Sequence, residues 1–419
     1  MADCCSAPGL MPFEQAKEKL LSSVPVVTET ELVKIEDADN RVLATDVTSP
    51  LNVPAHNNSA MDGYALRDDS LNSNAENLTE FTLIGSAFAG EPFTGELNNG
   101  ECIRIMTGAV VPASANTVVM QENVANIENT IGKAITLTQP TKLNNNIRFA
   151  GEDIREGEQV FVAGYSLKAV DIGLLASLGL PQVEVLRKLK VAVFSTGDEL
   201  KLPGQALTTG DIYESNSQVL VAMLHRLGVE VLPMGIIPDD LTAIESAFTK
   251  ADSAADAVIS SGGVSVGEAD YTKDVLDKLG KVDFWKVAMK PGKPFAYGNL
   301  PNSVFFGLPG NPVSAAVTFH QLTVPALMKM SGSETTENKR ISAVITDKVK
   351  KKPGRMDFQR GIASVNEDGD LQVAPLSAQG SGILSSISRA NCYIVLERDN
   401  AGHNAGETVK IELFDHILG

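Results

Sequence analysis

Residues 256–279, DAVISSGGVSVGEADYTKDVLDKL, give the clearest indication of the fold and of a binding site. The apolar start of this stretch is typical of a buried β-strand, and its end has a helical pattern. Between them, Gly262 and Gly263 allow backbone N–H groups to approach a phosphate closely. The carboxylates Glu268 and Asp270 suit a hard cation such as Mg²⁺, which takes oxygen ligands. We therefore predict a loop that holds an anionic ligand together with a metal ion.

Strands and helices alternate on both sides of this loop, from about residue 189 to residue 332. Over roughly 140 residues, this alternation predicts a mainly parallel sheet in a three-layer α/β domain. Helices are expected near 215–227, 241–250, 271–279 and 312–330.

The rest of the chain is predicted to be mostly β-structure. Residues 13–24 and 166–180 have helical patterns, whereas short β-like runs and turns fill the region from 32 to about 142. Short strands after Gly332 predict a small, β-barrel-like C-terminal domain. The expected fold class is therefore multidomain α/β plus β.

The composition excludes several classes of partner. With 419 residues, the chain should form roughly two to four domains. Its 52 acidic and 35 basic residues give a net charge of −17, which argues against nucleic acid and anionic membranes as partners. The four cysteines show no metal-binding spacing, and we see no signal peptide and no apolar run long enough to span a bilayer. A reducing cytoplasm fits best.

Polar loops follow three strands of the predicted sheet, where ligands bind in parallel α/β folds. They carry Asp198 and Glu199, then Asp239 and Asp240, then the glycine loop with Asp270. Each carboxylate alone is most simply a helix cap. Because three such loops should converge on one sheet edge, we favour a functional role for Asp270.

Two further segments are candidate anion sites. Lys286, Lys290 and Lys293 lie in a stretch with stiffening prolines, although such lysines are usually a solvated charge run. In GLPGNP, residues 307–312, Pro312 fits the first turn of a helix, and Asn311 could cap that helix. The start of the helix would then be an anion site. The alternative is a plain turn between a strand and a helix.

Other residues and motifs are less informative. Asp62, Thr107 and Asp153 lie in glycine-containing turns, and their spacing alone indicates nothing more than turns. The chain has no P-loop, no GxGxxG after a strand and no GxSxG elbow.

Nine motifs, in order from about residue 9 onward, resemble those of the MoeA family of molybdopterin molybdenumtransferases, also found as the E domain of gephyrin. They are NNSAMDGYAL, IRIMTGA, RFAGEDI, FSTGDEL, ISSGGVSVGEADYTK, WKVAMKPGKPFAYG, GLPGNPVS, DFQRG and NCYIVLERD. The resemblance implies that molybdate is inserted into adenylylated molybdopterin, with Mg²⁺-dependent hydrolysis of the phosphoanhydride and release of AMP.

The resemblance also implies a domain organisation and a homodimer with an inter-subunit active site. An extended helical and linker domain used for dimerisation would comprise 9–50 and 148–185, interrupted by a β-rich module at 51–147. A molybdopterin-binding α/β domain would follow at 186–332, and a β domain at 333–419. Further expected partners are the adenylyltransferase and downstream cofactor-handling proteins.

The motifs carry specific residues over to this chain. We expect catalytic roles for Asp62, Thr107, Asp153, Glu199, Asp270, Lys286 and Lys290, and metal binding by Glu199, Asp239 and Asp270, with Asp240 as the alternative to Asp239. We also expect substrate binding by Lys293, Pro309 and Pro312. Apart from the resemblance, the glycine loop adds Gly262, Gly263 and Ser265 to the expected substrate-binding residues, and the predicted helix start adds Ser314. We further hypothesise that Arg360 and Ser381 complete an oxyanion pocket with Lys290 and Lys293.

Two other functions stay open. A molybdopterin adenylyltransferase shares the α/β domain, but that group resembles GGTG after the strand, where this chain has GGVSVG. A dimeric scaffold is the second alternative, because the gephyrin E domain also binds receptor tails. We expect no fused partner domain and no long linker of the kind found in that scaffold.

Overall fold

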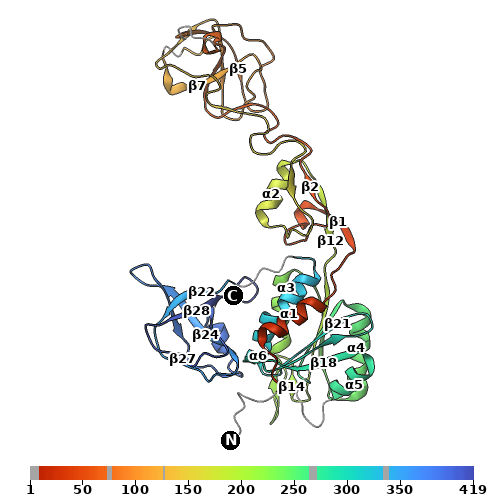
Figure 1. Cartoon of the computed structure of the whole chain (residues 1–419). Coiled ribbons are helices and arrows are strands. Elements are labelled where there is room, and N and C mark those ends of the chain that lie inside the picture. The colour runs from red at the N-terminus through yellow and green to blue at the C-terminus, as the bar shows by residue number, and fades with distance from the viewer. Residues whose placement is uncertain (1–8, 73–77, 126–127, 264–270, 334–338) are drawn as a thin grey trace.

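The computed structural model describes residues 9–72, 78–125, 128–263, 271–333 and 339–419. The molecule is elongated, with the β-rich module at one end and the α/β domain beside the C-terminal β domain at the other (Figure 1). A smaller domain lies between these two ends. In the ranges described, no helix has the length and apolar character needed to cross a membrane.

The α/β domain is built on a six-stranded sheet. In spatial order its strands are Glu230–Ile237 (β16), Lys190–Thr196 (β13), Ala257–Ser261 (β17), Val304–Leu308 (β21), Pro294–Asn299 (β20) and Lys281–Lys286 (β18). The first four are parallel, and the last two continue the sheet as antiparallel strands. Because parallel strands are covered on both faces, β13 and β17 are buried and contain unbroken apolar runs, Val191–Phe194 and Ala257–Ile259.

Helices cover both faces of this sheet, which confirms the predicted three-layer arrangement. One face packs on Leu241–Ala254 (α4) and Tyr271–Leu279 (α5). The other packs on Phe13–Ser23 (α1), Asn216–Leu227 (α3), Pro312–Thr318 (α6) and Val324–Met330 (α7), the last two joined by a π-helical segment, Phe319–Thr323 (η4). Alternate residues of β13 face the two cores, with Val191 and Val193 on one side and Ala192 and Phe194 on the other.

The middle domain connects the two ends through paired outgoing and returning segments. Thr30–Lys34 (β1) pairs with Gln182–Leu186 (β12), Val47–Thr48 (β2) with Gln159–Phe161 (β11), and Asn58–Ser59 (β3) with Ile147–Arg148 (β10). The helix Ala169–Ser177 (α2) and the 3-10 turn Ile35–Asp37 (η1) complete it. The helix predicted over 166–180 is therefore shorter than expected, and Gly179 follows it with φ +71°.

The inserted module contains a second six-stranded sheet. Its strands, in spatial order, are Thr117–Met120 (β7), Gly63–Leu66 (β4), Glu101–Ile105 (β6), Glu80–Ala87 (β5), Ala134–Leu137 (β9) and Val124–Ala125 (β8). The short 3-10 turns Asp69–Asn72 (η2) and Gln121–Asn123 (η3) lie between strands. Both faces are apolar, because Tyr64 and Leu66 join one core and Ala65 and Ile103 the other.

The C-terminal domain is a closed barrel of five strands, as the sequence predicted. The strands are Met356–Val365 (β24), Leu371–Pro375 (β25), Ile341–Ile345 (β22), Thr408–Leu413 (β28) and Cys392–Leu396 (β26), and β26 pairs back with β24. Smaller elements of this domain are Val349–Lys350 (β23), which pairs with Gly402–His403 (β27), and Ser385–Ser388 (α8). In the α/β domain, Leu200–Lys201 (β14) pairs with Ile212–Tyr213 (β15) between β13 and α3.

The barrel docks firmly on the α/β domain. Met289–Lys290 (β19), from the α/β domain, pairs with β24 of the barrel. Phe358 of the barrel packs edge-on against Phe13 of α1, with ring centroids 5.2 Å apart. Polar contacts add to this interface, since His320 Nε2 lies 3.2 Å from Asp415 and Gln321 donates to Glu412 at 3.0 Å.

Candidate functional site

A pocket of about 480 Å³ lies at the carboxyl ends of β13, β16 and β17. The loops that follow these strands meet there because the strands are parallel neighbours. The pocket brings together several predicted site residues and one glycine of the barrel: Glu199, Asp239, Gly262, Gly263, Pro312 and Gly382.

The two glycines leave no room for side chains at the pocket floor. Gly262 and Gly263 have φ values of +94° and +64°, which glycine adopts at little cost. A Cβ on Gly262 would lie 2.8 Å from the Thr196 carbonyl oxygen, and one on Gly263 would lie 2.3 Å from Thr272 Oγ1. A ligand can therefore approach this backbone closely. The predicted residues Ser265 and Asp270 lie outside the described residues.

Carboxylates gather in the loops that follow β13 and β16. Asp198 Oδ1 accepts a hydrogen bond from the Asp239 N–H at 3.1 Å. Partial loss of hydration raises the pKa of Asp239, and the negative charges of Asp198 and Glu199 raise it further. Asp240 instead caps α4 by accepting from the Ala243 N–H at 2.8 Å. Asp239 is therefore the aspartate that lines the pocket.

This cluster is not a preformed metal cage. Within the described part of the chain, no group of three or more His, Cys, Asp or Glu side chains is arranged to hold a metal ion. Glu199 and Asp239 can nevertheless supply hard oxygen ligands to one cation from two neighbouring loops.

The sequence analysis missed two residues that organise the pocket wall. Glu214 is only 2% exposed and accepts hydrogen bonds from Ser195 Oγ at 3.0 Å and from the Ser217 N–H at 2.7 Å. Asn216 Nδ2 donates to Ser261 Oγ and to the Gly310 carbonyl, both at 2.8 Å. These hydrogen bonds connect three of the loops that line the pocket. In the sequence, the same residues only mark a helix start.

The GLPGNP turn differs in part from the prediction. Pro312 begins α6 as expected, but the Asn311 side chain makes no capping hydrogen bond, so that prediction was wrong. The Val313 N–H donates instead to the Ser381 carbonyl oxygen at 3.0 Å, because a barrel loop covers the helix start. Ser314 is buried, and so is Pro309.

The predicted lysines lie apart from this pocket. Lys290 lines a second cavity at the barrel junction and forms an ion pair with Asp357 at 3.2 Å. Lys286 is exposed at the end of β18, and Lys293 is partly buried in the turn before β20. None of the three is among the described residues that line the Glu199 pocket.

Arg360, hypothesised to bind the oxyanion, is 1% exposed inside the barrel. It donates to Ser386 Oγ at 3.1 Å and to the carbonyls of Ala378 and Gly380 at 3.4 and 3.3 Å. Burial lowers the pKa of this guanidinium. In this conformation its donors are directed at protein acceptors.

Asp62 and Thr107 form a pair in the inserted module. Asp62 Oδ1 accepts from the Thr107 N–H at 2.7 Å and from its hydroxyl at 2.8 Å. These bonds lower the pKa of Asp62. The inserted module and the pocket lie at opposite ends of the molecule (Figure 1). Asp153 is exposed in the segment that leads from the module back to the middle domain. One copy of the chain therefore does not bring these residues to Glu199.

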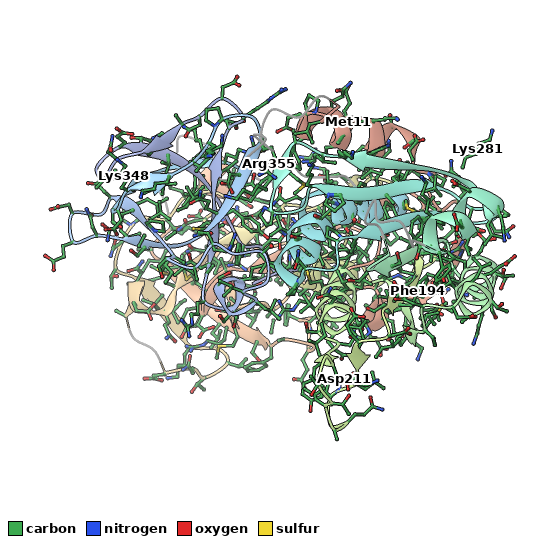
Figure 2. All side chains as sticks on the ribbon, turned by 90° about the horizontal axis from the view of Figure 1, so that it is seen from below. Met11, Phe194, Asp211, Lys281, Lys348 and Arg355 are labelled. Carbon is green, nitrogen blue, oxygen red and sulfur yellow. The ribbon has the colours of Figure 1, made fainter. Side chains whose placement is uncertain are left out.

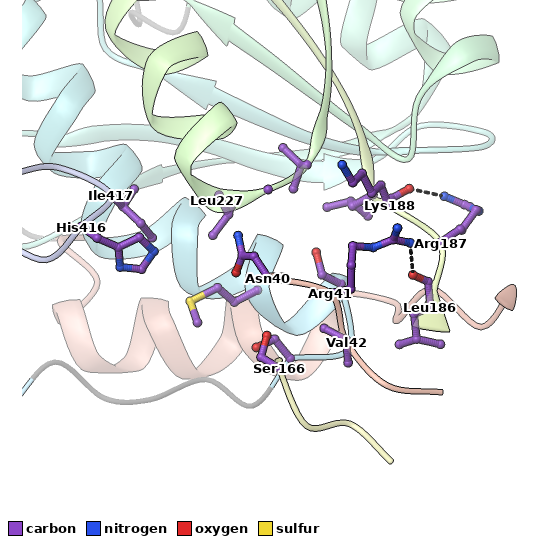
Figure 3. A pocket seen from close by; sticks show the side chains of 16 residues that line it. Asn40, Arg41, Val42, Ser166, Leu186, Arg187, Lys188, Leu227, His416 and Ile417 are labelled. Atoms are coloured by element: carbon purple, nitrogen blue, oxygen red, sulfur yellow. Dashed lines mark hydrogen bonds between the residues drawn. The ribbon is translucent and has the colours of Figure 1, made fainter. Parts of the chain in front are cut away.

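A smaller cavity lies where the middle domain meets α3 and the C-terminal segment (Figure 3). Its two arginines are engaged by the protein. Arg41 donates to the Leu186 carbonyl at 2.8 Å and pairs with Glu31, whereas Arg187 pairs with Asp256 at 2.7 Å. This cavity is a domain junction whose arginines already have partners.

Three family models match successive parts of the chain. They are described as MoeA N-terminal region (domain I and II), over residues 11–179, probable molybdopterin binding domain, over 192–329, and MoeA C-terminal region (domain IV), over 342–414. The chain is 46% identical over 411 residues to a molybdopterin molybdenumtransferase of Haemophilus influenzae, covering 98% of this chain and 100% of the relative. The chain belongs to the MoeA family of molybdopterin molybdenumtransferases. It is therefore a transferase.

Other MoeA relatives agree along the whole chain. A molybdopterin molybdenumtransferase of Bacillus subtilis is 33% identical over 387 residues, covering 92% of this chain and 90% of the relative. The crystal structure of a molybdopterin biosynthesis moeA protein from Pyrococcus horikoshii superimposes with a TM-score of 0.81 at 31% identity, covering 97% of this chain and 100% of the other. The MoeA fold thus extends over all parts of the molecule, which confirms the resemblance.

Proposed function

We propose that this protein inserts molybdate into adenylylated molybdopterin and hydrolyses the phosphoanhydride, releasing AMP and molybdenum cofactor. One observation carries the proposal: a single pocket joins the backbone of Gly262 and Gly263 to the carboxylates of Glu199 and Asp239. Close backbone approach suits a phosphate, and oxygen ligands suit its metal counter-ion. The names of the MoeA relatives support the choice of substrate.

The residues present fit a bound Mg²⁺. Glu199 and Asp239 offer hard oxygen ligands. The pKa of Asp239 is raised first by its partial loss of hydration and then by the negative charges of Asp198 and Glu199, and a cation would offset both effects. We assign both as metal ligands, with Asp270 as the third. When bound, Mg²⁺ would offset negative charge on the phosphoanhydride oxygens. The glycine backbone would hold and orient the phosphate beside it.

The remaining residues are assigned from their chemistry and from the MoeA resemblance. Lys290 and Lys293 would receive molybdate, with Lys286, Arg360 and Ser381 contributing to substrate binding or catalysis. Asp62, Thr107 and Asp153 would act from the inserted module of a second copy in a homodimer. The elongated shape supports this assignment, since the module lies too far from the pocket of its own chain (Figure 1). We place the enzyme in the cytoplasm, where an adenylyltransferase could deliver its substrate.

The test is AMP release from adenylylated molybdopterin, with and without molybdate and Mg²⁺. We expect release that depends on both, and a product that activates a cofactor-free molybdoenzyme. Asp239→Asn should raise the Mg²⁺ concentration needed for half-maximal release. Asp240→Asn is the matched control, because asparagine also caps helices and Asp240 caps α4 outside the pocket.

Two outcomes would favour the alternatives. ATP consumption without molybdate would support an adenylyltransferase. Absence of AMP release under every condition, from folded protein, would favour a scaffold. Equal Mg²⁺ dependence in Asp239→Asn and Asp240→Asn would reject the assigned metal role of Asp239.

A further inference from the structure

The middle domain and the inserted module, residues 30–186, form an arm that rises from the α/β domain (Figure 1). Two segments of chain connect them, and both are bonded to the α/β domain. The Val27 N–H donates to the Met330 carbonyl at the end of α7, at 2.8 Å. On the returning segment, Arg187 donates to both carboxylate oxygens of Asp256, at 2.7 and 2.8 Å. Two neighbouring attachments define an axis, about which the arm could still tilt.

Two helices of the α/β domain end against the base of this arm. Gly228 follows α3 and Gly332 follows α7, with φ values of +82° and +78°. A Cβ on Gly228 would lie 2.6 Å from Asn40 Nδ2, and one on Gly332 would lie 2.2 Å from Leu186 Cδ1. Glycine therefore allows the arm to approach both helix ends closely. We call these two helix ends, at Gly228 and Gly332, the seat of the arm.

A cavity of about 80 Å³ remains between the arm and the seat (Figure 3). Ser166 lines it from the arm, and Ser331 lines it from the α/β domain. Because one water molecule takes up about 30 Å³, the two surfaces are nearly in contact here. Arg41, which is 7% exposed, pairs with Glu31 of β1 and donates to the Leu186 carbonyl of β12 at 2.8 Å. It thus locks together the two strands from which the arm rises.

We propose that the seat sets the tilt of the arm and so positions the inserted module for the pocket of a second copy. A long arm magnifies any rotation at its base, so a small change at the seat displaces Asp62 at the far end. Gly228 and Gly332 are then positioning residues, which act through Asp62 and lie outside the Glu199 pocket. The reaction that they serve rests on the proposed function, whereas the tilt itself does not.

Ser166→Trp tests the tilt, because it places an indole ring in the cavity between the arm and the seat. Pulsed electron spin resonance measures the distance between nitroxide labels on Val170→Cys of the arm and Lys281→Cys of the α/β domain, two exposed positions. Cys4 and Cys5 are replaced by serine, and excess unlabelled chain separates the labels of neighbouring copies. Packed carbon atoms lie about 3.5–4 Å apart, so one inserted ring should shift the mean label distance by about 3 Å or more.

Two controls separate the tilt from other effects of the ring and the labels. Val162→Trp places the same ring on the arm at a position that is 53% exposed and outside the cavity, and it should leave the label distance unchanged. Labels on Lys348→Cys and Lys281→Cys lie on the barrel and on the α/β domain (Figure 2), so their distance should not change in any variant. Ser331→Trp fills the cavity from the α/β domain and is the second test variant, should Ser166→Trp not fold.

Subunit mixing tests the positioning role. In a dimer of one Asp62→Ala chain and one Asp239→Asn chain, the intact site takes its pocket from the first chain and its module from the second. AMP release is measured at a Mg²⁺ concentration too low to support Asp239→Asn alone. Ser166→Trp in the Asp239→Asn chain tilts the arm that supplies the module, and should lower AMP release about a hundredfold. The same change in the Asp62→Ala chain tilts the idle arm and should leave AMP release unchanged.

The outcomes separate the tilt, its role and the proposed function. An unchanged label distance in folded Ser166→Trp or Ser331→Trp protein would overturn the role of the seat in setting the tilt. A shifted distance with equal AMP release from the two placements of Ser166→Trp would overturn the positioning role. Absence of AMP release from the wild type would reject the proposed function, and the label distances would still decide whether the seat sets the tilt.

Discussion

Replacing Asp415 by asparagine tests how the barrel is held against the α/β domain. Asp415 follows the last barrel strand and meets His320 of η4, which is 2% exposed, with 3.2 Å between His320 Nε2 and each carboxylate oxygen. Burial alone would raise the pKa of Asp415. Hydrogen bonds from His320 and from the N–H groups of Ile417 and Leu418 outweigh it and lower the pKa to about 2. The ionised carboxylate is thus favoured by the folded state.

The pKa gives the size of the effect and its pH dependence. The pKa of Asp415 falls from its ordinary value of 3.8 to about 2 in the folded protein. This difference corresponds to about 2 kcal/mol of folding stability at neutral pH. Because the folded pKa is the lower one, this stability is present above pH 3.8 and is lost as pH falls toward 2. About half should remain at pH 3. Asp415→Asn should therefore destabilise the protein most at pH 7 and progressively less below pH 4.

Urea unfolding followed by fluorescence measures this difference, since Trp285 of the α/β domain is the only tryptophan. Glu407→Gln is the matched control, because Glu407 also pairs with a histidine, His403, but both residues belong to the barrel and the Glu407 side chain is 48% exposed. We expect no measurable change for the control. An Asp415→Asn protein as stable as wild type at pH 7, or equally destabilised at pH 7 and pH 3, would refute the reasoning.

Three further predictions concern other parts of the fold. Gly263→Ala, at φ +64° and with a neighbouring hydroxyl oxygen 2.3 Å from the new Cβ, should lower the free energy of unfolding by about 1–3 kcal/mol in urea titrations. Asp256→Asn breaks the paired hydrogen bonds from Arg187, at 2.7 and 2.8 Å. It should lower the free energy of unfolding by about 1–3 kcal/mol in the same measurement. Burial raises the pKa of Cys102 to about 12 and that of Cys392 to about 11, so peptide mapping after thiol labelling at pH 8 should find both unmodified until the protein unfolds.

The sequence was most informative where a periodic pattern coincides with burial. The apolar runs of β13 and β17 have helices on either side in the chain, and parallel strands need such crossovers. The order of strands then fixes which loops meet, so the sequence pattern alone predicts that Glu199, Asp239 and Gly262 lie together. This inference requires only the topology of one domain.

The positions of the lysines could not be predicted in the same way. Lys290 follows α5 and β18 in the same α/β domain, yet its contacts are set by β24 of the barrel, to which β19 pairs. Sequence patterns indicate where strands form, but they do not indicate which strand edge of one domain pairs with another domain. The hydrogen-bonding role of Asn216 was missed for a related reason, since its partners Ser261 and Gly310 lie on separate loops.

The division of the predicted site follows from the way the domains are connected. Asp62 and Thr107 lie on a module whose two connecting segments pair with each other, so the module is held away from the pocket rather than folded back over it (Figure 1). The pairing of Asp62 with Thr107 is complete within one chain, with both hydrogen bonds formed. A catalytic role for this pair therefore requires a second copy to place it at a pocket.

Subunit mixing tests this requirement. At a Mg²⁺ concentration too low to support Asp239→Asn, mixing Asp62→Ala subunits with Asp239→Asn subunits should restore part of the AMP release that each variant lacks alone, because one of the two sites in a mixed dimer would contain both native residues. Mixing two preparations of the same variant is the control, and it should restore nothing. Two inactive variants that stay inactive after subunit exchange would place the whole site within one chain, and the paired connecting segments would then have to bend for Asp62 to reach Asp239.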